Sequence, residues 1–464
     1  MRLMGKKRQK IQLELAFMTE DRGETPMAGI EGSEMPMAKR KPENPTLPDL
    51  LMEEVCQREN LWKALQRVRK NKGSCGIDGM TVKKLGGYLS KHWPNIREQL
   101  LQGSYQPQPV KRVEIAKPGG GVRKLGIPTV LDRFIQQSVL QVLQKYWDRT
   151  FSEHSYGFRP GRSAHQAIAQ SQRYVDDGYH WVVDIDLEKF FDRVNHDKLM
   201  GRLAQRITDK RVLKLTRAFL NAGVMENGLV NATTEGAPQG GPLSPFLSNV
   251  VLNDLDRELE RRGHCFVRYA DDCNIYVRSE RAGHRVMESV SNFITGKLKL
   301  KVNQSKSHIG RPWEYKFLGF RIAVGRKSKR TIAPVAVARF KDRVRELTRR
   351  TRGVTIKQMI EQLNRYLIGW RGYFGFCETP SVLKDLDSWI HRRLRSVTWK
   401  QWKRGKKRFA ELRKLGVSED LAAKTAGSAH GPWRISRCLA LSYALPNTYF
   451  DTLGLAKLVD RLTV

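Results

Sequence analysis

The segment HCFVRYADDCNIYVRS, residues 264–279, constrains the fold of this chain more than any other stretch. Residues that favour β-strands stand on both sides of Asp271 and Asp272, and this pattern predicts a β-hairpin with both carboxylates at its tip. A solvated turn presents the same pair of carboxylates, so the hairpin alone leaves a structural and a chemical interpretation open.

A third carboxylate favours the chemical interpretation. The run WVVDID predicts a strand that ends at Asp186, and a strand end beside the hairpin would gather three negative charges. Such a cluster is costly unless cations fill it, and oxygen ligands favour Mg²⁺. Two Mg²⁺ ions about 4 Å apart suit in-line nucleotidyl transfer. Asp184, two residues earlier on the same strand face, is the alternative ligand to Asp186.

A second aspartate pair, Asp176 and Asp177 in YVDD, has a different setting. The apolar spacing before it predicts a helix, and Gly178 is a natural helix stop. Solvated carboxylates are common at a helix end, so we interpret this pair as structural.

The charge of the chain indicates a polyanionic partner. The 464 residues carry a formal net charge of +37, and a chain this basic repels itself unless a polyanion binds it. Nucleic acid is the leading candidate because binding to its phosphates releases counterions. A generally basic, solvated surface is the alternative.

The positions of the cysteines argue against a zinc-binding protein, and the lengths of the apolar runs argue against a membrane protein. The six cysteines are scattered without a CxxC pair, so we expect reduced thiols rather than a zinc ribbon. No apolar run approaches the roughly 18 residues of a membrane span. We therefore expect a cytoplasmic protein with no membrane partner.

The order of helical and strand-like segments predicts an α+β unit up to about residue 325 and a basic helical part from about 338. Residues 130–147 have the apolar spacing of a helix, and KPGGG at 117–121 is typical of a second hairpin tip. An earlier helical run should stop at Gly73. Residues 1–45 lack periodicity and predict a flexible extension.

An ordered set of motifs, DLEKFFD, GAPQGGPLSPFLSNVVLNDLD, YADD and FLGFRI, resembles the successive blocks of reverse transcriptases. More narrowly, NKGSCGIDGMTV, SYGFRPGRSAHQAI and LNRYLIGWRGYFGF resemble segments of the bacterial group II intron-encoded reverse transcriptases, or maturases. The resemblance runs from about residue 58 to the C-terminus. It implies a right-hand polymerase with an antiparallel palm sheet: fingers at 46–165, palm at 166–337, helical thumb at 338–412 and a small basic DNA-binding region at 413–464.

The resemblance also implies the metal ligands. Asp186, Asp271 and Asp272 match the family's triad, and register selects Asp186 because the family's aspartate stands four positions before the paired phenylalanines. The backbone carbonyl of Leu187 would bind the second metal. The implied cofactor is a pair of Mg²⁺ ions, with Mn²⁺ as a substitute.

The same resemblance implies a site for the incoming dNTP. Phe191 matches the steric gate beneath the sugar, whereas Phe190 is expected in the core because neighbours on a strand face opposite ways. Gln239 would contact the nucleotide. Lys117 and Arg123 flank the predicted hairpin tip and would clamp the triphosphate.

Two further motifs match residues near the primer end. Lys306 matches the lysine that protonates pyrophosphate. The turn in FLGF matches the primer grip, and its residues are Phe317, Leu318 and Gly319. Apolar side chains in such a turn fit a plain core equally well.

Cations and aromatic rings alternate in the C-terminal part, a composition that suits phosphate contacts and stacking on unpaired bases. An amphipathic helix with a solvated face and a tryptophan seam is the alternative. The candidate nucleic-acid contacts are Arg365 with its neighbour Tyr366, Trp370, Arg371, Arg392, Arg393, Lys400, Lys403 and Arg404.

The function that the resemblance implies is an RNA-directed DNA polymerase that assists splicing of its own group II intron and supports mobility by target-primed reverse transcription. Its partners would be intron RNA, an RNA template with a DNA primer, target DNA and dNTPs. We expect a monomer or homodimer associated with the bacterial nucleoid or an RNP. A non-enzymatic RNA-binding maturase and a reverse transcriptase used in phage defence are the alternatives.

Relatives in this family often carry a Cys/His-rich nuclease domain after the DNA-binding region. Only Cys438 lies beyond residue 412, so no target-cutting HNH endonuclease is expected here. Mobility would then need a primer from elsewhere, such as a replication fork.

Overall fold

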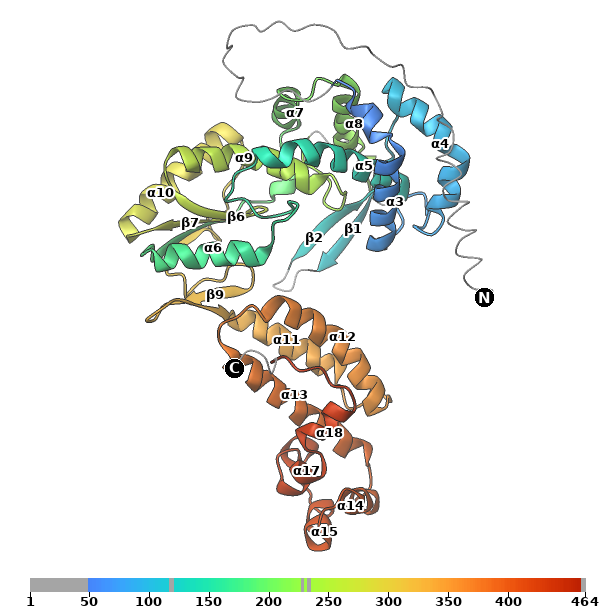
Figure 1. Cartoon of the computed structure of the whole chain (residues 1–464), viewed down its shortest axis with the longest axis vertical. Helices are drawn as coiled ribbons and strands as arrows, with labels where there is room; N and C mark the ends of the chain where they lie inside the picture. The colour runs from blue at the N-terminus through green and yellow to red at the C-terminus, as the bar shows by residue number, and fades with distance from the viewer. Residues whose placement is uncertain (1–48, 117–120, 227–228, 232–234, 460–464) are drawn as a thin grey trace, which may run out of the picture. The chain divides into compact units, whose positions relative to one another are not determined.

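The computed structural model describes residues 49–116, 121–226, 229–231 and 235–459. These residues form two compact units (Figure 1). The first contains the residues up to 167 and residues 183–309, and the second contains residues 168–182 and those from 310 onward. The predicted extension, residues 1–45, lies outside the described residues.

The first unit begins with helices α2 (Leu51–Val55), α3 (Arg58–Asn71), α4 (Leu85–Gln102) and α5 (Val130–Trp147). One face of α3 is buried against α5 (Figure 1). The predicted stop of this helix differs in detail, because Lys72 rather than Gly73 takes the left-handed conformation, with φ of 51°. A Cβ on Gly73 would lie 2.0 Å from the Arg133 guanidinium, a flexible group that can move aside, so this contact alone does not require a glycine.

The first sheet has the strand order β2-β1-β4-β5, from β1 (Val110–Ala116), β2 (Val122–Ile127), β4 (Val224–Glu226) and β5 (Leu229–Asn231). Strands β1 and β2 are antiparallel and bring Ala116 opposite Val122, which confirms the hairpin predicted around KPGGG. Residues 117–120 at its tip lie outside the described residues, and so does the predicted clamp residue Lys117.

The second sheet has the order β6-β7-β3-β8 and is formed by β6 (Cys265–Tyr269), β7 (Asp272–Val277), β3 (Trp181–Ile185) and β8 (His308–Gly310). The predicted β6–β7 hairpin is confirmed, and so is the predicted strand before the paired phenylalanines, which ends at Ile185, one residue before the predicted end at Asp186. Helix α9 (Ser244–Arg261) contacts β6, and α10 (Glu280–Phe293) contacts β7 (Figure 1).

Further helices and turns occur before residue 309. They are the 3₁₀ turns η1 (Asp148–Thr150) and η2 (Phe190–Asp192), the helices α6 (Ala164–Asp176), α7 (His196–Ala204) and α8 (Lys210–Asn221), and the π-turn η3 (Ile294–Leu298).

The second unit pairs β9 (Phe320–Ala323) with β10 (Lys329–Ile332) and continues as helices. Helices α11 (Pro334–Leu347), α12 (Ile356–Phe374) and α13 (Pro380–Gln401) pack together (Figure 1). The first of them begins four residues before the predicted position 338, because Pro334 can occupy the first helical turn. Five shorter helices follow: α14 (Gly405–Lys414), α15 (Glu419–Ala426), α16 (Pro432–Ile435), α17 (Leu439–Ala444) and α18 (Asn447–Thr452).

One hydrophobic core runs through the helices of the second unit. It contains buried side chains from Ile332 to Leu458, among them Leu412 and Val417, which lie on the two sides of the predicted boundary at residue 412. The helices before and after that boundary therefore share one core. Within the described ranges, no helix combines the length and the apolar character that crossing a membrane requires.

Candidate active site

Two of the three predicted catalytic carboxylates, Asp186 and Asp271, come from different strands and lie close to each other in the first unit. Asp271 occupies the β6–β7 turn, where Tyr269 pairs with Asp272, and Asp186 follows the last residue of β3, the neighbouring strand. Burial raises the pKa of Asp271, and the nearby charge of Asp186 raises it further. The hairpin and the strand end thus place negative charge at one end of the sheet.

This arrangement suits a divalent cation. A positive ion between the carboxylates would oppose both causes of the raised Asp271 pKa, and carboxylate oxygens are the ligands that Mg²⁺ takes. Throughout the ranges that the structure describes, however, no three His, Cys, Asp or Glu side chains are grouped closely enough to hold a metal. The third carboxylate, Asp272, is exposed at the start of β7.

The backbone around Asp186 is held by residues more than a hundred positions later. The Asp186 amide donates a hydrogen bond of 3.0 Å to the hydroxyl oxygen of Ser307, and the Asp186 carbonyl accepts one of 2.8 Å from the Asn303 amide. Nζ of Lys306 is 3.9 Å from Oδ2 of Asp186. The predicted Lys306 therefore lies beside the carboxylate site, and Ser307 is a further contact of Asp186 that no local sequence pattern predicted.

Asp184, the alternative ligand, has another neighbour. Its Oδ2 is 3.4 Å from Nε2 of His308 on β8. Leu187, which would offer a carbonyl to the second metal, forms an isolated bridge with Val302 directly after Asp186. These positions favour Asp186 over Asp184 beside Asp271.

The predicted gate lies in a turn rather than a strand. Phe190 and Phe191 are in the 3₁₀ turn η2, so the expected alternation of strand neighbours was the wrong reason for distinguishing them. Phe190 is nevertheless buried, with 2% of its surface exposed, whereas Phe191 is half-buried. Their rings are 5.3 Å apart at 74°.

The loop that contains Gln239 is fixed between the gate and strand β2. The Ala237 amide donates to the Phe191 carbonyl at 2.6 Å, and the Gly126 amide donates to the Gln239 carbonyl at 2.8 Å. Gly240 has a φ of +135°, and a Cβ there would lie 2.6 Å from the Gly126 carbonyl oxygen. Only a glycine fits this close approach.

Arg123 lies on β2, the strand that Gly126 joins to the Gln239 loop. Its charge lowers the pKa of Asp271, in opposition to the effects of burial and Asp186. A guanidinium near the carboxylates is suited to hold a triphosphate. Arg123 is thus the described member of the predicted clamp, and it lies near the carboxylate site.

A buried arginine supports the turn that carries Asp271. Arg268 is fully buried, and its guanidinium donates to both carboxylate oxygens of the equally buried Asp256, at 2.7 and 2.5 Å. It also donates to the Ala270 carbonyl at 2.7 Å, the Asn249 side-chain oxygen at 3.0 Å and the Ser155 hydroxyl oxygen at 2.8 Å. The sequence pattern does not predict this network, because an arginine in a strand is usually an exposed residue.

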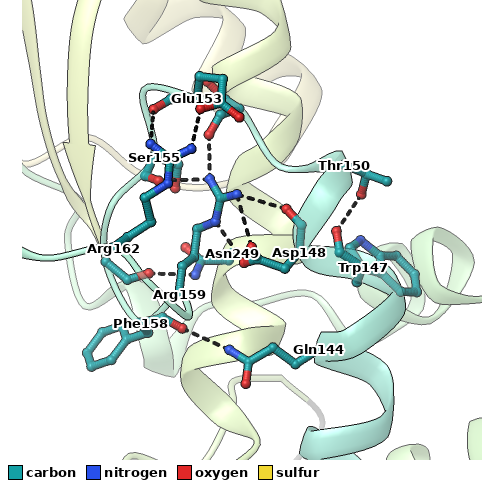
Figure 2. Close-up of polar contacts among 12 residues, drawn as sticks. Gln144, Trp147, Asp148, Thr150, Glu153, Ser155, Phe158, Arg159, Arg162 and Asn249 are labelled. Atoms are coloured by element: carbon teal, nitrogen blue, oxygen red, sulfur yellow. Dashed lines mark hydrogen bonds and ion pairs between the residues drawn. The ribbon is translucent and has the colours of Figure 1, made fainter.

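The loop of the SYGFRPGRS motif packs against the same turn. Asn249 donates to the Gly157 carbonyl at 2.8 Å, and a Cβ on Gly157 would lie 2.2 Å from the Ala270 nitrogen. Figure 2 shows the Arg159 side chain pointing into the loop, where it donates to Asp148 Oδ1 at 2.9 Å and to the Ser155 carbonyl at 2.8 Å. The loop is therefore a rigid support for the hairpin tip.

Phe158 stands out in this loop. It has a left-handed φ of 58°, half of its surface is exposed, and its ring centroid is 6.3 Å from that of Tyr269. Figure 2 shows its carbonyl bonded by Gln144 and its ring pointing away from the Arg159 contacts. A bulky residue in this conformation is strained, and here the surrounding hydrogen bonds hold it.

The YVDD pair is a helix end, as predicted. Helix α6 ends at Asp176, Gly178 has a φ of +89°, and the Tyr179 amide bonds the Tyr174 carbonyl. Asp176 accepts a 3.2 Å hydrogen bond from the Ser328 amide in the same unit.

The predicted primer grip is an ordered turn of the second unit. Phe317 and Phe320 exchange two backbone hydrogen bonds of 2.9 Å, and Leu318 and Gly319 between them have φ values of 50° and 82°. The Tyr373 hydroxyl on α12 donates to the Leu318 carbonyl at 2.8 Å. The turn is thus fixed to the helices that follow it.

The predicted nucleic-acid contacts range from buried through half-buried to exposed residues. Trp370 packs on Phe340 and Phe374 with centroid distances of 4.3 and 4.7 Å and is 8% exposed, so it belongs to the core rather than the surface. Tyr366 stacks on Phe340. Arg371 donates to the Lys457 carbonyl, Arg393 donates to Thr348, and the exposed residues are Arg365, Lys400, Lys403 and Arg404.

Two families match this chain. Residues 115–322 match the family described as Reverse transcriptase (RNA-dependent DNA polymerase), and residues 337–416 match the one described as Group II intron, maturase-specific domain. The first match contains Asp186 and Asp271, and the second covers α11 to α14 almost completely.

Several curated proteins are similar to this chain. Protein YkfC of Escherichia coli is 33% identical over 313 residues, which are 59% of this chain and 82% of YkfC. The group II intron-encoded protein LtrA of Lactococcus lactis is 30% identical over 333 residues, 57% of this chain and 55% of LtrA. A putative COX1/OXI3 intron 2 protein of Saccharomyces cerevisiae is 28% identical, over 65% of this chain and 42% of its own length. The match thus spans about half of LtrA.

Proposed function

Since the chain belongs to the reverse transcriptase/maturase family encoded by group II introns, we propose that it polymerises DNA on an RNA template at the carboxylate site of its first unit. The observation that carries this proposal is the pairing of Asp186 and Asp271 at one sheet end, with Arg123 and Lys306 beside them. In this reading the chain has fingers at 46–165, a palm at 166–337, a thumb at 338–412 and a DNA-binding region at 413–464.

Asp186, Asp271, Asp272 and the Leu187 carbonyl are the proposed ligands of two Mg²⁺ ions, for which Mn²⁺ would substitute. When bound, such ions make the primer 3′-hydroxyl a better nucleophile and neutralise charge on the triphosphate. The chain holds the ligands in place through Ser307 at the Asp186 backbone and Arg268 at the Ala270 carbonyl. Preorganised ligands need no rearrangement when the substrates arrive.

The residues around the carboxylates bind and select the incoming dNTP. Arg123, together with Lys117, contacts the triphosphate, whose negative charge their cations match. Phe191 faces the sugar and rejects a 2′-hydroxyl by collision, and Gln239 contacts the nucleotide from its glycine-bounded loop. Lys306 is the proton donor to the departing pyrophosphate. Its Nζ lies beside Asp186, within reach of the same site.

The second unit would bind nucleic acid rather than catalyse. Its proposed ligands are the primer end, held at Phe317–Gly319, the chain's own intron RNA, and target DNA. The match to the maturase-specific domain supports the RNA-binding role, and the net charge of +37 supports a polyanionic ligand in general. Splicing assistance and target-primed mobility are proposed on that basis.

Primer extension on an RNA template with Mg²⁺ and dNTPs tests the polymerase. Asp271→Ala should lower the rate by roughly 10⁴-fold, the scale typical when a catalytic group is removed. Asp177→Ala is the matched control because it removes an exposed aspartate from the similar YVDD motif. Wild-type protein that binds RNA tightly but extends no primer would refute the polymerase and favour a non-enzymatic maturase.

A further inference from the structure

The second unit contains a cavity of about 310 Å³ whose lining is cationic and aromatic. Arg345 on α11 and Arg350 in the following loop form one side, Trp389 and Arg393 on α13 form another, and Trp433 on α16 completes it. None of the residues that line it is acidic. We refer to these five residues as the arginine–tryptophan cavity.

The charges in this cavity are only partly neutralised. Arg345 forms an ion pair of 2.5 Å with Asp342, its neighbour one turn earlier. Arg393 donates to the hydroxyl and the carbonyl of Thr348, which are uncharged. Arg350 is exposed and has no ion-pair partner among the residues that the structure describes. Two guanidinium charges thus face the cavity without a carboxylate.

Repulsion among the arginines of the cavity makes the binding of an anion more favourable. Burial lowers the pKa of Arg393, and the charges of Arg345 and Arg350 lower it further. A bound phosphate would offset both effects because it supplies a negative charge and several hydrogen-bond acceptors. The fork of a guanidinium matches phosphate geometry better than a lysine ammonium does.

Two indole rings give the cavity an aromatic surface. The Trp389 ring has the guanidinium of Arg393 at 5.5 Å and that of Arg345 at 5.7 Å from its centroid. The Trp433 ring carries Arg392 at 3.8 Å and keeps 36% of its surface exposed. Exposed rings next to cations are typical of sites where an unpaired base stacks beside its own phosphate.

The size of the cavity limits its ligand. It is at the lower end of the range of roughly 300–1,000 Å³ found for small-molecule sites, so it admits one nucleotide and no duplex. We propose that the arginine–tryptophan cavity binds a single unpaired nucleotide of a nucleic-acid strand, with the phosphate between Arg350 and Arg393 and the base on Trp433. This inference rests on the proposed function only in requiring that the second unit binds nucleic acid.

Fluorescence anisotropy with labelled 12-nucleotide single strands of RNA and of DNA, and with the matching duplexes, tests this inference on the full chain. Arg350→Gln should weaken single-strand binding and lower the slope of log K against log salt by about 0.7, the value for one lost phosphate contact. Trp433→Ala should weaken single-strand binding by about 5- to 100-fold, as the loss of one stacked base does. A selective loss on RNA or on DNA identifies the source of the nucleotide.

Arg343→Gln is the matched control, because Arg343 lies on α11, the helix that precedes the loop of Arg350, is exposed, and pairs with Glu346 away from the cavity. It removes the same charge as Arg350→Gln. Equal affinities and equal salt slopes for the two variants would overturn the proposal, and so would equal weakening of single-strand and duplex binding by Trp433→Ala. Thermal unfolding of each variant checks that the chain is folded.

The test of the cavity can be distinguished from the test of the proposed polymerase activity. Primer extension on a short primer–template at saturating concentration should be unchanged in Arg350→Gln, since Arg350 is not in the catalytic machinery. Loss of single-strand affinity in that variant would support the cavity even if wild-type protein extended no primer. Conversely, active wild-type enzyme with unaltered Arg350→Gln binding would refute the cavity alone.

Discussion

The guanidinium of Arg268 donates a hydrogen bond of 2.7 Å to the carbonyl oxygen of Ala270, the residue before Asp271. Ala270 has a left-handed φ of 58°, a conformation that costs energy for any residue with a Cβ. The same guanidinium is neutralised by Asp256 and is fully buried. The hairpin tip is thus held in a strained turn by a buried ion pair.

Substitutions in the Arg268–Asp256 pair should affect the stability of the protein and its catalytic rate separately. Asp256→Asn should destabilise the protein by about 3–5 kcal/mol, because it leaves a buried charge without its partner. The double variant Arg268→Met with Asp256→Leu should regain most of that stability, because an apolar pair can replace a buried ion pair.

The double variant should nevertheless stay at least tenfold below wild type in kcat, with little change in the KM for dNTP, because the Ala270 carbonyl has lost its donor. Thermal unfolding and steady-state primer extension measure both effects. Recovery of stability and kcat together would show that Arg268 supports the fold and has no role in positioning the tip.

Gly157 should be intolerant of a methyl group. A Cβ at this position would lie 2.2 Å from the Ala270 nitrogen, so Gly157→Ala must displace the hairpin tip or the loop that supports it. We expect kcat for primer extension to fall by tenfold or more, since a small misplacement of catalytic groups is costly. Gly201→Ala is the control, because nothing lies near that helical position and alanine should add about 0.5–1 kcal/mol of stability. Similar kcat values for both variants would contradict the packing argument.

Phe191 should control sugar selection. Phe191→Val shortens the half-buried ring, so the preference for dNTP over rNTP in kcat/KM should fall by roughly 10- to 100-fold, the range for one apolar contact in a pocket. Phe190→Leu is the control for this variant because Phe190 is buried beside it, and its change should affect stability and leave the preference intact. Competition between labelled dNTP and rNTP on one template gives the ratio directly.

The sequence predicted those parts of the site whose signals are local. The hairpin around Asp271, the strand end at Asp186 and the helix end at Asp176 each follow from a run of β-favouring residues or from a glycine stop. The contact of Ser307 with Asp186 spans 121 positions and has no local signal. Such contacts depend on the tertiary packing of the sheet.

Side-chain burial was predicted less well than the elements. Trp370 has the composition of a stacking surface around it, and the packing of α12 on α11 decides that it is buried. Arg268 is also buried, although an arginine is expected at the surface, and its partner Asp256 lies on another element. A pattern of residue types does not say which face of an element the neighbouring elements cover.

The second unit should lose stability in mild acid through His391. This side chain is 5% exposed, and burial lowers its pKa below the ordinary value of 6.5. Between the lowered folded pKa and 6.5 the unfolded chain binds a proton that the folded chain does not, so stability falls as pH falls. The loss is at most about 1.4 kcal/mol per pH unit.

His391→Gln keeps a donor for the Asp387 carbonyl and cannot titrate, so its Tm should fall less than that of wild type between pH 7.5 and 5.5. The comparison of the two Tm profiles is the measurement. Parallel profiles would assign the acid sensitivity to other groups.

Splicing assistance should survive the loss of polymerase activity. The carboxylates lie in the first unit, whereas the maturase-specific match, residues 337–416, lies in the second. RNA binding needs a folded cationic surface, and removal of two carboxylates makes the protein more basic. We therefore expect the double variant Asp271→Ala with Asp272→Ala to extend no primer and to promote splicing of the cognate intron RNA at low Mg²⁺ within about twofold of wild type.

A variant with exposed cations of the second unit removed, such as Lys400→Gln with Lys403→Gln, should show the reverse pattern, with weaker splicing assistance and retained extension of a short primer. Splicing yield and primer extension on the same preparations measure the two activities. A folded carboxylate variant that fails to assist splicing would mean that the metal site also organises the RNA-binding surface, and the separation of the two functions would be wrong.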